Sequence, residues 1–121
     1  MILGEGVSVF AARPVSGRAY WFSSPADVLL VDPKTLGETI AFVRMPGVAF
    51  LSPILGQLRA VVCTTGSPAS HLALVALQYG VPCIMGAELH EDLPDGTAVR
   101  LEMRAGRRAR ITAGAASRPP A

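Results

Sequence analysis

His71 is the residue of this 121-residue chain that is best placed to do chemistry. It follows a turn rich in threonine, serine and glycine and lies near the start of a segment with the composition of a helix. Backbone N–H groups and the positive end of the helix dipole gather at such a start. This setting disfavours the imidazolium form, so we expect His71 to be neutral and nucleophilic near pH 7.

The same setting favours a phosphoryl dianion on or near the imidazole, because helix N-termini bind anions. Phosphate oxygens would also accept hydrogen bonds from the turn, where the proposed contacts are Thr64, Thr65, Gly66, Ser67 and Ser70. A histidine nucleophile divides one difficult phosphoryl transfer into two easier ones. The alternative is that His71 is an ordinary core or rim residue, as a lone histidine in an apolar setting usually is.

His90 is the second histidine and stands in an acidic loop with Glu88, Glu91 and Asp92. Histidine and carboxylate side chains are metal ligands, but this spacing matches no established ligand pattern. We therefore expect a solvated loop and no metal site.

Cys63 and Cys83 do not have the spacing of a CxxC or zinc-binding motif, and both have apolar neighbours. We expect them to be small core residues rather than a disulfide or a metal pair. Free thiols are typical of a reducing compartment, which predicts a cytoplasmic protein.

The net charge is only +2, but arginines gather near the C-terminus at Arg100, Arg104, Arg107, Arg108 and Arg110. Such a cluster can attract nucleic acid or another polyanion. No aromatic side chain interleaves with these arginines, so the stacking surface of a single-strand binder is missing. We expect a solvated hairpin and no nucleic-acid partner.

The longest stretch without charged residues, 60–87, is long enough to raise the question of a membrane span. Glycine and proline interrupt it repeatedly, which a transmembrane helix rarely tolerates. The N-terminus has no basic segment followed by an apolar run, so no signal peptide is predicted. We expect no membrane partner.

The element that must position His71 is a helix predicted over residues 68–79. Ser67 is a suitable N-cap, and proline suits the first helical position. Gly80 is a suitable C-terminal cap, with Pro82 beyond it.

The other elements are predicted to be short. Strands are expected within residues 1–20, near a sheet edge, and at 28–31, 60–63 and 83–86. Thr35 and Glu38 have capping-box spacing ahead of a helix predicted over residues 36–44. A hairpin is predicted over residues 97–111, with its turn at 104–106. This alternation predicts an α/β domain with a mixed sheet flanked by short helices over residues 1–111. A disordered tail is expected over 112–121.

The segment from Thr64 to Gly86 resembles the mobile phosphohistidine domain of the PEP-utilising enzymes. That family includes pyruvate phosphate dikinase, PEP synthase, enzyme I of the sugar phosphotransferase system and rifampicin phosphotransferase. Its pattern runs roughly G-G-x-x-S-H-x-A-x-x-A-R, followed by a turn with glycine and proline and a strand that ends in glycine. The residues that match are Gly66, Ser70, His71, Ala73, Ala76, Gly80, Pro82 and Gly86, and later Asp95, Gly96 and Gly106.

The resemblance spans about residues 4–111 and implies a swivelling β/β/α fold with His71 as the phosphorylated residue. Three positions depart from the family pattern. Ser67 replaces the second glycine, Ala69 replaces a threonine that many members have, and Leu77 replaces an arginine. If the family's threonine hydroxyl or arginine guanidinium touches phosphate, the loss of either group would weaken phosphate binding by about 1.5–3 kcal/mol.

The resemblance also implies that the domain does not act alone. It implies a phosphocarrier subunit of a split phosphotransferase, working with an ATP-grasp-like nucleotide-binding subunit and an acceptor-binding subunit or domain. ATP and Mg²⁺ are expected at the partner, and no cofactor is expected on this chain.

Two alternatives stay open. One is a non-catalytic docking or regulatory module of the same fold, which has lost its phosphate contacts at Ala69 and Leu77. The other is the small swivelling subunit of aconitase-like dehydratases, a group with a Gly-Ser-Ser type motif and no Ser-His pair on the helix.

Overall fold

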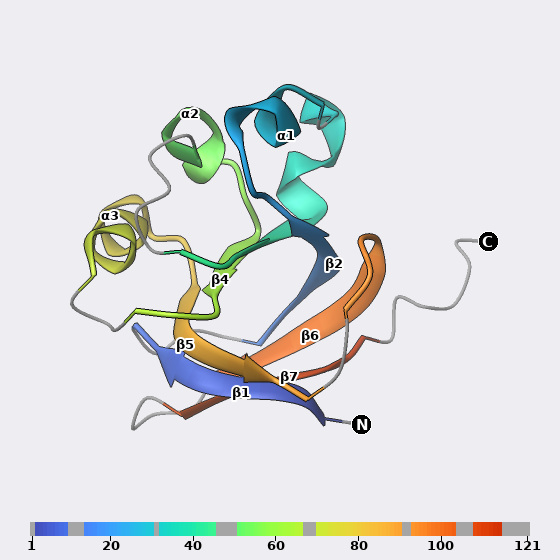
Figure 1. The fold of residues 1–121 in the computed structure, drawn as a ribbon, viewed down its shortest axis with the longest axis vertical. Helices are drawn as coiled ribbons and strands as arrows, with labels where there is room; N and C mark the ends of the chain where they lie inside the picture. The colour runs from blue at the N-terminus through green and yellow to red at the C-terminus, as the bar shows by residue number, and fades with distance from the viewer. Residues whose placement is uncertain are drawn as a thin grey trace.

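The strands of this protein close into a barrel in the order β1-β5-β4-β3-β2-β6-β7 (Figure 1). The computed structural model describes residues 2–9, 14–30, 32–45, 51–66, 70–90, 93–103 and 108–114. The strands are β1 (Ile2–Ser8), β2 (Val15–Trp21), β3 (Thr39–Val43), β4 (Ala60–Cys63), β5 (Cys83–Leu89), β6 (Thr97–Met103) and β7 (Arg108–Ala113).

The prediction of a swivelling β/β/α domain, with a mixed sheet flanked by short helices, is wrong. Strands β2, β3, β4 and β5 run parallel, and β6 pairs antiparallel with β2 and β7. Strand β1 then pairs antiparallel with both β5 and β7, so that Val7 is opposite Met85 on one side and Arg108 on the other. This double pairing joins the two edges of the sheet, and the fold is mostly β with few short helices.

The helical segments gather on one side of the barrel, beside the parallel strands (Figure 1). They are α1 (Pro25–Leu30), the 3-10 helix η1 (Pro33–Glu38), α2 (Ser52–Leu55) and α3 (His71–Tyr79). No described helix has the length and apolar character needed to cross a lipid bilayer.

Alternate residues of the parallel strands belong to two separate hydrophobic cores. Ile40 and Phe42 of β3 join a core to which every strand contributes, and which therefore fills the barrel interior. Ala41 and Val43 join a second core, between the barrel wall and the helices. Strand β3 has a core on each side, so all five of its residues are buried. Burial on both faces explains why residues 40–43 form a continuous apolar run.

The apolar run at residues 28–31, predicted to be a buried strand, lies mostly in α1 instead, and Val31 is outside the described residues. The carboxylate of Asp27 accepts a hydrogen bond from the N–H of Ser23 at 2.6 Å, which supports a helical turn here. Leu29 and Leu30 are 85% and 84% exposed. The prediction was wrong because a run of four apolar residues fits either element.

The helix predicted over residues 36–44 is also wrong. Asp32 is the N-cap of η1 and accepts a hydrogen bond from the N–H of Lys34 at 2.9 Å. The 3-10 helix ends at Glu38, and the chain continues as β3. Burial of both faces of this segment overrides the local capping signal of Thr35 and Glu38.

The structure confirms the strands predicted within residues 1–20, at 60–63 and at 83–86. It also confirms the C-terminal hairpin. The expected sheet edge near the N-terminus is absent among the described strands, since β1 is paired on both sides. The turn at residues 104–106 lies outside the described residues. Strand β7 continues to Ala113, and the N–H of Gly114 donates to the carbonyl of Ala98 at 2.9 Å. Strand β7 thus extends past residue 111, and residues 115–121 lie outside the described part of the chain.

Candidate functional site

His71 is the first residue of α3, and its side chain is exposed to solvent. Ser70 is the N-cap, with an extended backbone (φ −65°, ψ 154°), and its carbonyl accepts the N–H of Leu74 at 3.1 Å. The N–H groups that precede Leu74 have no partner within the helix and point past its start. The predicted helix start at residue 68, with Ser67 as the N-cap, is wrong, because α3 begins at His71 with Ser70 as its N-cap. Residues 67–69 themselves lie outside the described part of the chain.

The rest of α3 holds His71 on the outer surface of the protein. Leu72, Ala73 and Ala76 are buried in the core between the helices and the barrel wall. At the other end, Gly80 has a left-handed conformation (φ 69°), and its N–H donates to the carbonyls of Ala76 and Leu77. This C-terminal cap agrees with the prediction from the sequence.

The turn that follows β4 is anchored to the neighbouring strands. The N–H of Thr64 donates to the carbonyl of Val43 at 3.0 Å, and the N–H of Gly86 donates to the carbonyl of Thr65 at 3.1 Å. The hydroxyl of Thr65 donates to the carbonyl of Arg44 at 2.7 Å. Thr65 was predicted to donate to phosphate, but its hydroxyl hydrogen is already used to join the loops after β3 and β4.

Gly66 and Gly86 approach each other closely at this turn. Both have positive φ, at 79° and 61°. A Cβ atom on Gly86 would lie 3.3 Å from the carbonyl oxygen of Gly66. Gly86 therefore allows β5 to support the turn that leads toward His71.

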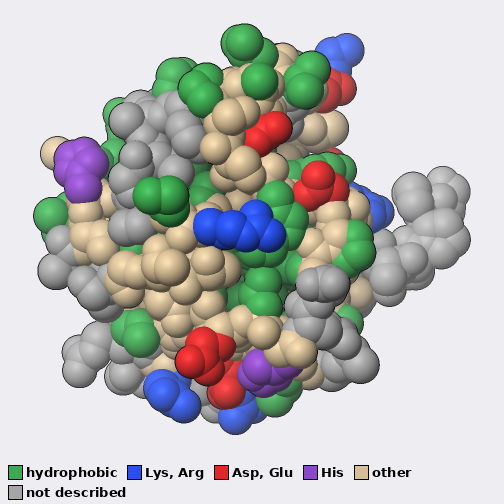
Figure 2. All heavy atoms as spheres, viewed as in Figure 1, with side chains coloured by type: hydrophobic (Ala, Val, Ile, Leu, Met, Phe, Trp, Pro, Cys, Tyr) green, Lys and Arg blue, Asp and Glu red, His purple; other side chains and the backbone are tan. Residues whose placement is uncertain are grey.

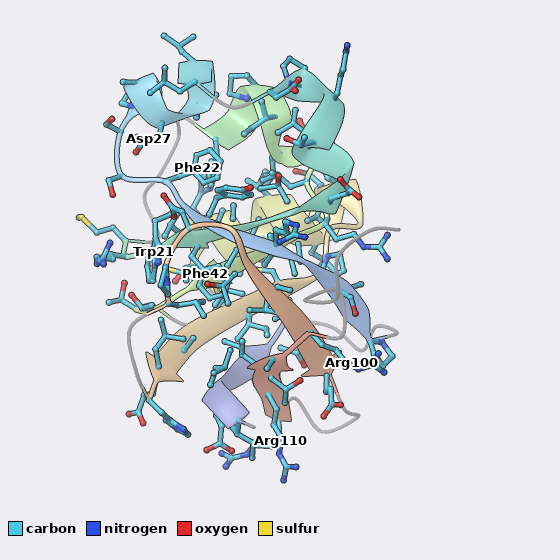
Figure 3. The ribbon with its side chains drawn as sticks, turned by 90° about the vertical axis from the view of Figure 1, so that its right-hand side faces the viewer. Trp21, Phe22, Asp27, Phe42, Arg100 and Arg110 are labelled. Carbon is cyan, nitrogen blue, oxygen red and sulfur yellow. The ribbon has the colours of Figure 1, made fainter. Side chains whose placement is uncertain are left out.

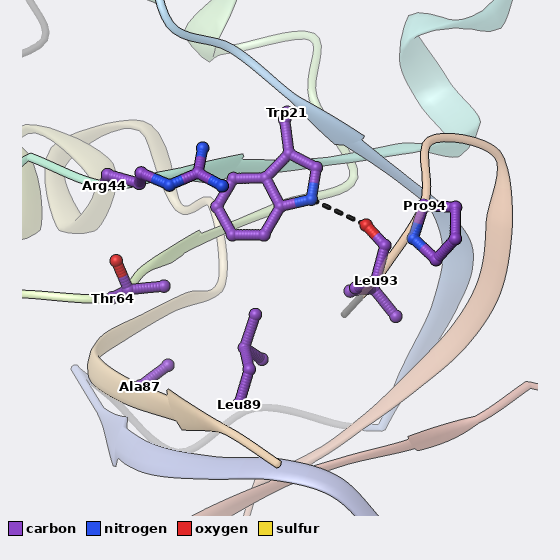
Figure 4. Close-up of a pocket in the computed structure, with 7 residues that line it drawn as sticks. All are labelled: Trp21, Arg44, Thr64, Ala87, Leu89, Leu93 and Pro94. Carbon is purple, nitrogen blue, oxygen red and sulfur yellow. Dashed lines mark hydrogen bonds between the residues drawn. The ribbon is translucent and has the colours of Figure 1, made fainter. Parts of the chain in front are cut away.

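A pocket of about 570 Å³ lies at the carboxyl ends of the parallel strands. Its lining residues come from four strands or the segments that follow them, and are Trp21, Arg44, Thr64, Ala87, Leu89, Leu93 and Pro94 (Figure 4). On the face shown in Figure 2, apolar side chains surround a basic group near the middle of the molecule. Of Trp21, Arg44 and Thr64, only Thr64 follows a strand that the sequence predicts. Trp21 lies just past the predicted N-terminal strands, Arg44 falls in the helix wrongly predicted over residues 36–44, and the parallel pairing that brings the three together was not predicted.

Trp21 is held in place by several contacts. Its indole Nε1 donates to the carbonyl of Leu93 at 2.7 Å, and its backbone N–H donates to Asp95 Oδ1 at 2.8 Å. Its ring packs against Phe42 with centroids 5.4 Å apart, and the guanidinium carbon of Arg44 lies 4.1 Å from the centroid of Trp21. The pocket is therefore preformed around a cation–π pair.

Among the other candidate groups, His90, Arg100 and Arg110 are not lining residues of this pocket. His90 Nε2 lies 4.0 Å from Glu5 Oε2, while Glu91 and Asp92 are outside the described residues. Arg100 is 3.4 Å from Glu102. Figure 3 shows Arg100 and Arg110 at the end of the molecule opposite Asp27. Arg104 and Arg107 are not among the described residues.

The two cysteines are free and buried, as predicted. Cys83 Sγ lies 3.6 Å from the sulfur of Met85. Burial, together with the nearby thiol of Cys63, raises the pKa of Cys83 from 9.0 to about 12. Such a thiol is protonated and unreactive at neutral pH.

Comparisons with known proteins agree with the resemblance of the His71 region. A family model described as "PEP-utilising enzyme, mobile domain" matches residues 37–106. Chondramide synthase cmdD of Chondromyces crocatus is 30% identical over 74 residues. That match covers 60% of this chain and 2% of the synthase, so the chain spans a very small part of this relative.

Proposed function

This chain belongs to the family of PEP-utilising enzyme mobile domains, and we propose that it is a phosphocarrier in which His71 receives and delivers a phosphoryl group. The observation that carries the proposal is the position of His71, exposed as the first residue of a capped helix. An exposed imidazole can enter the active site of another subunit. The family match supports the same residue, because His71 lies in the matched segment.

The chemistry requires two displacements at phosphorus. A ring nitrogen of neutral His71 attacks the phosphorus of the donor, a P–N bond forms, and the P–O bond to the leaving group breaks. The leaving oxygen keeps the bonding electron pair. In the second step an acceptor oxygen attacks, the P–N bond breaks, and its electron pair returns to the imidazole.

The chain's own contribution is to hold the imidazole and to stabilise charge. The N–H groups at the start of α3 favour a dianion on His71. Ser70 and the backbone near Gly66 are the proposed additional contacts, together with Thr64 and Ser67. Thr65 contributes by bracing the turn through its bond to Arg44.

The proposed partners supply the phosphoryl donor and the acceptor. We propose an ATP-grasp-like subunit that holds ATP and Mg²⁺, and a separate acceptor-binding subunit or domain. The complex would work in the cytoplasm as a split phosphotransferase, and the chain would be inactive alone.

The test is intact-mass spectrometry of the protein after incubation with host lysate and either ATP or PEP. The wild type is expected to gain one phosphoryl group, which acid treatment removes, because phosphohistidine is acid-labile. His71→Ala should gain none, while His90→Ala, which removes the other histidine, should be labelled like the wild type. Labelling of His71→Ala, or no labelling with either donor, would reject the proposal.

A second candidate, a docking or regulatory module, is favoured by the outer face of α3. Leu74, Leu77 and Tyr79 are 55%, 48% and 58% exposed, and Leu77 occupies the position of the family's arginine. Large exposed apolar groups mark protein contacts when they form a patch. Tight binding of a partner that is unchanged in His71→Ala, without any labelling, would favour this candidate.

A further inference from the structure

We propose that the pocket formed by Trp21, Arg44 and Thr64 binds a small organic oxyanion, a phosphate or carboxylate group carried on an apolar body. This inference goes beyond the phosphocarrier proposal, because it does not depend on His71, which is not among the lining residues.

Arg44 supplies the charge. Within the described residues the ion pairs are His90–Glu5 and Arg100–Glu102, so the guanidinium of Arg44 has no carboxylate partner there. Its guanidinium carbon lies over the ring of Trp21, 4.1 Å from the ring centroid. Stacking of this kind leaves the N–H groups at the edge of the guanidinium available for a bidentate oxyanion.

Thr64 supplies a second polar group in the same pocket. Its backbone N–H is bonded to the carbonyl of Val43, which fixes its position beside the loop that carries Arg44. In the described part of the chain its hydroxyl makes no hydrogen bond, whereas that of Thr65 is committed to Arg44. Figure 4 shows Arg44 and Thr64 together on one side of the pocket.

The side of the pocket opposite Arg44 is lined by apolar side chains and suits the apolar body of the proposed ligand. Leu93 and Pro94 lie across the pocket from Arg44, and Leu89 lies between them and Thr64 (Figure 4). None of the described lining residues is acidic, and the nearby carboxylate of Asp95 accepts a hydrogen bond from the backbone N–H of Trp21. The volume of about 570 Å³ is in the range of small-molecule sites, and the anchored ring of Trp21 makes the site preformed.

Trp21 is the chain's only tryptophan, so its fluorescence reports on ligands that bind beside its ring. Trp21 also lines a neighbouring pocket with Tyr20 and Phe22, and the Arg44 and Thr64 variants below distinguish the two pockets. The full chain would be titrated with four ligands that share one apolar body: n-butyl phosphate, n-butyrate, n-butanol and n-butylammonium. We expect saturable changes with the anions, with dissociation constants on the order of millimolar for ligands of this size. Butanol and butylammonium should bind at least about tenfold more weakly. The anion with the lower dissociation constant identifies whether the natural ligand carries a phosphate or a carboxylate.

Variants test the assignment of the charge. Arg44→Gln is expected to weaken anion binding about tenfold or more, and Thr64→Val to weaken it less. Arg100→Gln, an arginine on β6, is the matched control and should bind like the wild type. Because Arg44→Gln alters the surroundings of the fluorophore, its affinity would also be measured by calorimetry.

Two results would overturn the inference: equal binding of butanol and the anions, or wild-type affinity in Arg44→Gln. His71→Ala should keep wild-type anion affinity. The mass-spectrometric labelling of His71 tests the phosphocarrier proposal, and the anion titration tests this inference. The failure of one can therefore be distinguished from the failure of the other.

Discussion

At the scale of single residues, the polar side chains inside the protein are satisfied to different degrees. Ser8 and Thr39 are the buried polar residues among those described. The hydroxyl of Thr39 donates to the carbonyl of Thr35 at 2.9 Å, whereas Oγ of Ser8 has no hydrogen-bond partner in the described structure. A buried hydroxyl without a partner loses its hydration and gains nothing in return.

Ser8→Ala is therefore expected to stabilise the protein, raising the free energy of unfolding by about 1 kcal/mol. Thr39→Val is the matched control, because it removes a buried hydroxyl that is bonded, and it should lower the free energy of unfolding by about 1 kcal/mol. Urea denaturation of the three proteins measures both. A loss of stability in Ser8→Ala would show that Oγ has a partner in the folded protein.

Cys83 makes stability depend on pH in the alkaline range. Its pKa is raised to about 12 by burial and by Cys63, while the unfolded thiol titrates near 9.0. The folded state thus holds the proton more tightly, and this contribution to stability is complete below pH 9 and is lost as the pH rises toward 12. The loss is expected to be on the order of 3 kcal/mol.

Comparison with Cys83→Ala isolates this effect from the titration of tyrosines and lysine. Denaturation at pH 8 and pH 11 should show a smaller loss of stability in the variant than in the wild type. Equal losses in the two proteins would mean that the thiol ionises as easily in the folded state as in the unfolded state.

At the scale of elements, the turn after β4 depends on a neighbouring strand. Gly86 in β5 donates its N–H to Thr65 and has a positive φ of 61°. In a side-chain-bearing residue this conformation is strained, and a Cβ there would press on the carbonyl of Gly66 at 3.3 Å. The turn toward His71 is thus supported by backbone contacts that only glycine allows.

Gly86→Ala is expected to lower the free energy of unfolding by about 1–2 kcal/mol, and to slow phosphoryl labelling if His71 is the carrier. Gly37→Ala is the control, since no atom lies within 4 Å of the added Cβ and its φ is not positive. Thermal denaturation should show a lower melting temperature only for Gly86→Ala. Similar melting temperatures for both variants would mean that the turn adapts without cost.

At the scale of the whole molecule, closure of the barrel depends on the chain's two ends. Strand β1 is paired with β7 along most of its length, including Glu5 opposite Arg110 and Gly6 opposite Ala109. Removal of β7 would leave β1 and β6 each with one unpaired edge and would open the interior core, to which Ala109 and Ile111 contribute.

Truncation tests this dependence. A chain ending at residue 107 is expected to lose cooperative unfolding, because β7 is absent and the interior core is exposed. A chain ending at Gly114 keeps β7 and should melt at the wild-type temperature. Circular dichroism on heating measures both, and a cooperative transition in the shorter chain would show that the barrel does not require β7.

The sequence by itself determined the elements whose signals are local. The helix that presents His71 ends at Gly80 because glycine accepts a left-handed cap, and the hairpin of β6 and β7 follows from short β-rich runs around a turn. The motif around His71 likewise identified the family, since it needs no knowledge of distant contacts.

Only the tertiary structure decided the features that depend on what each segment packs against. Residues 28–31 and 40–43 are short apolar runs that fit a helix or a strand. The second run lies in β3 because it is buried on both faces, whereas the first lies mostly in α1. Barrel closure pairs Val7 with Arg108, about a hundred residues away, and no local signal encodes such a contact. The pocket of Trp21 and Arg44 exists for the same reason, because parallel pairing of separate strands brings their ends together.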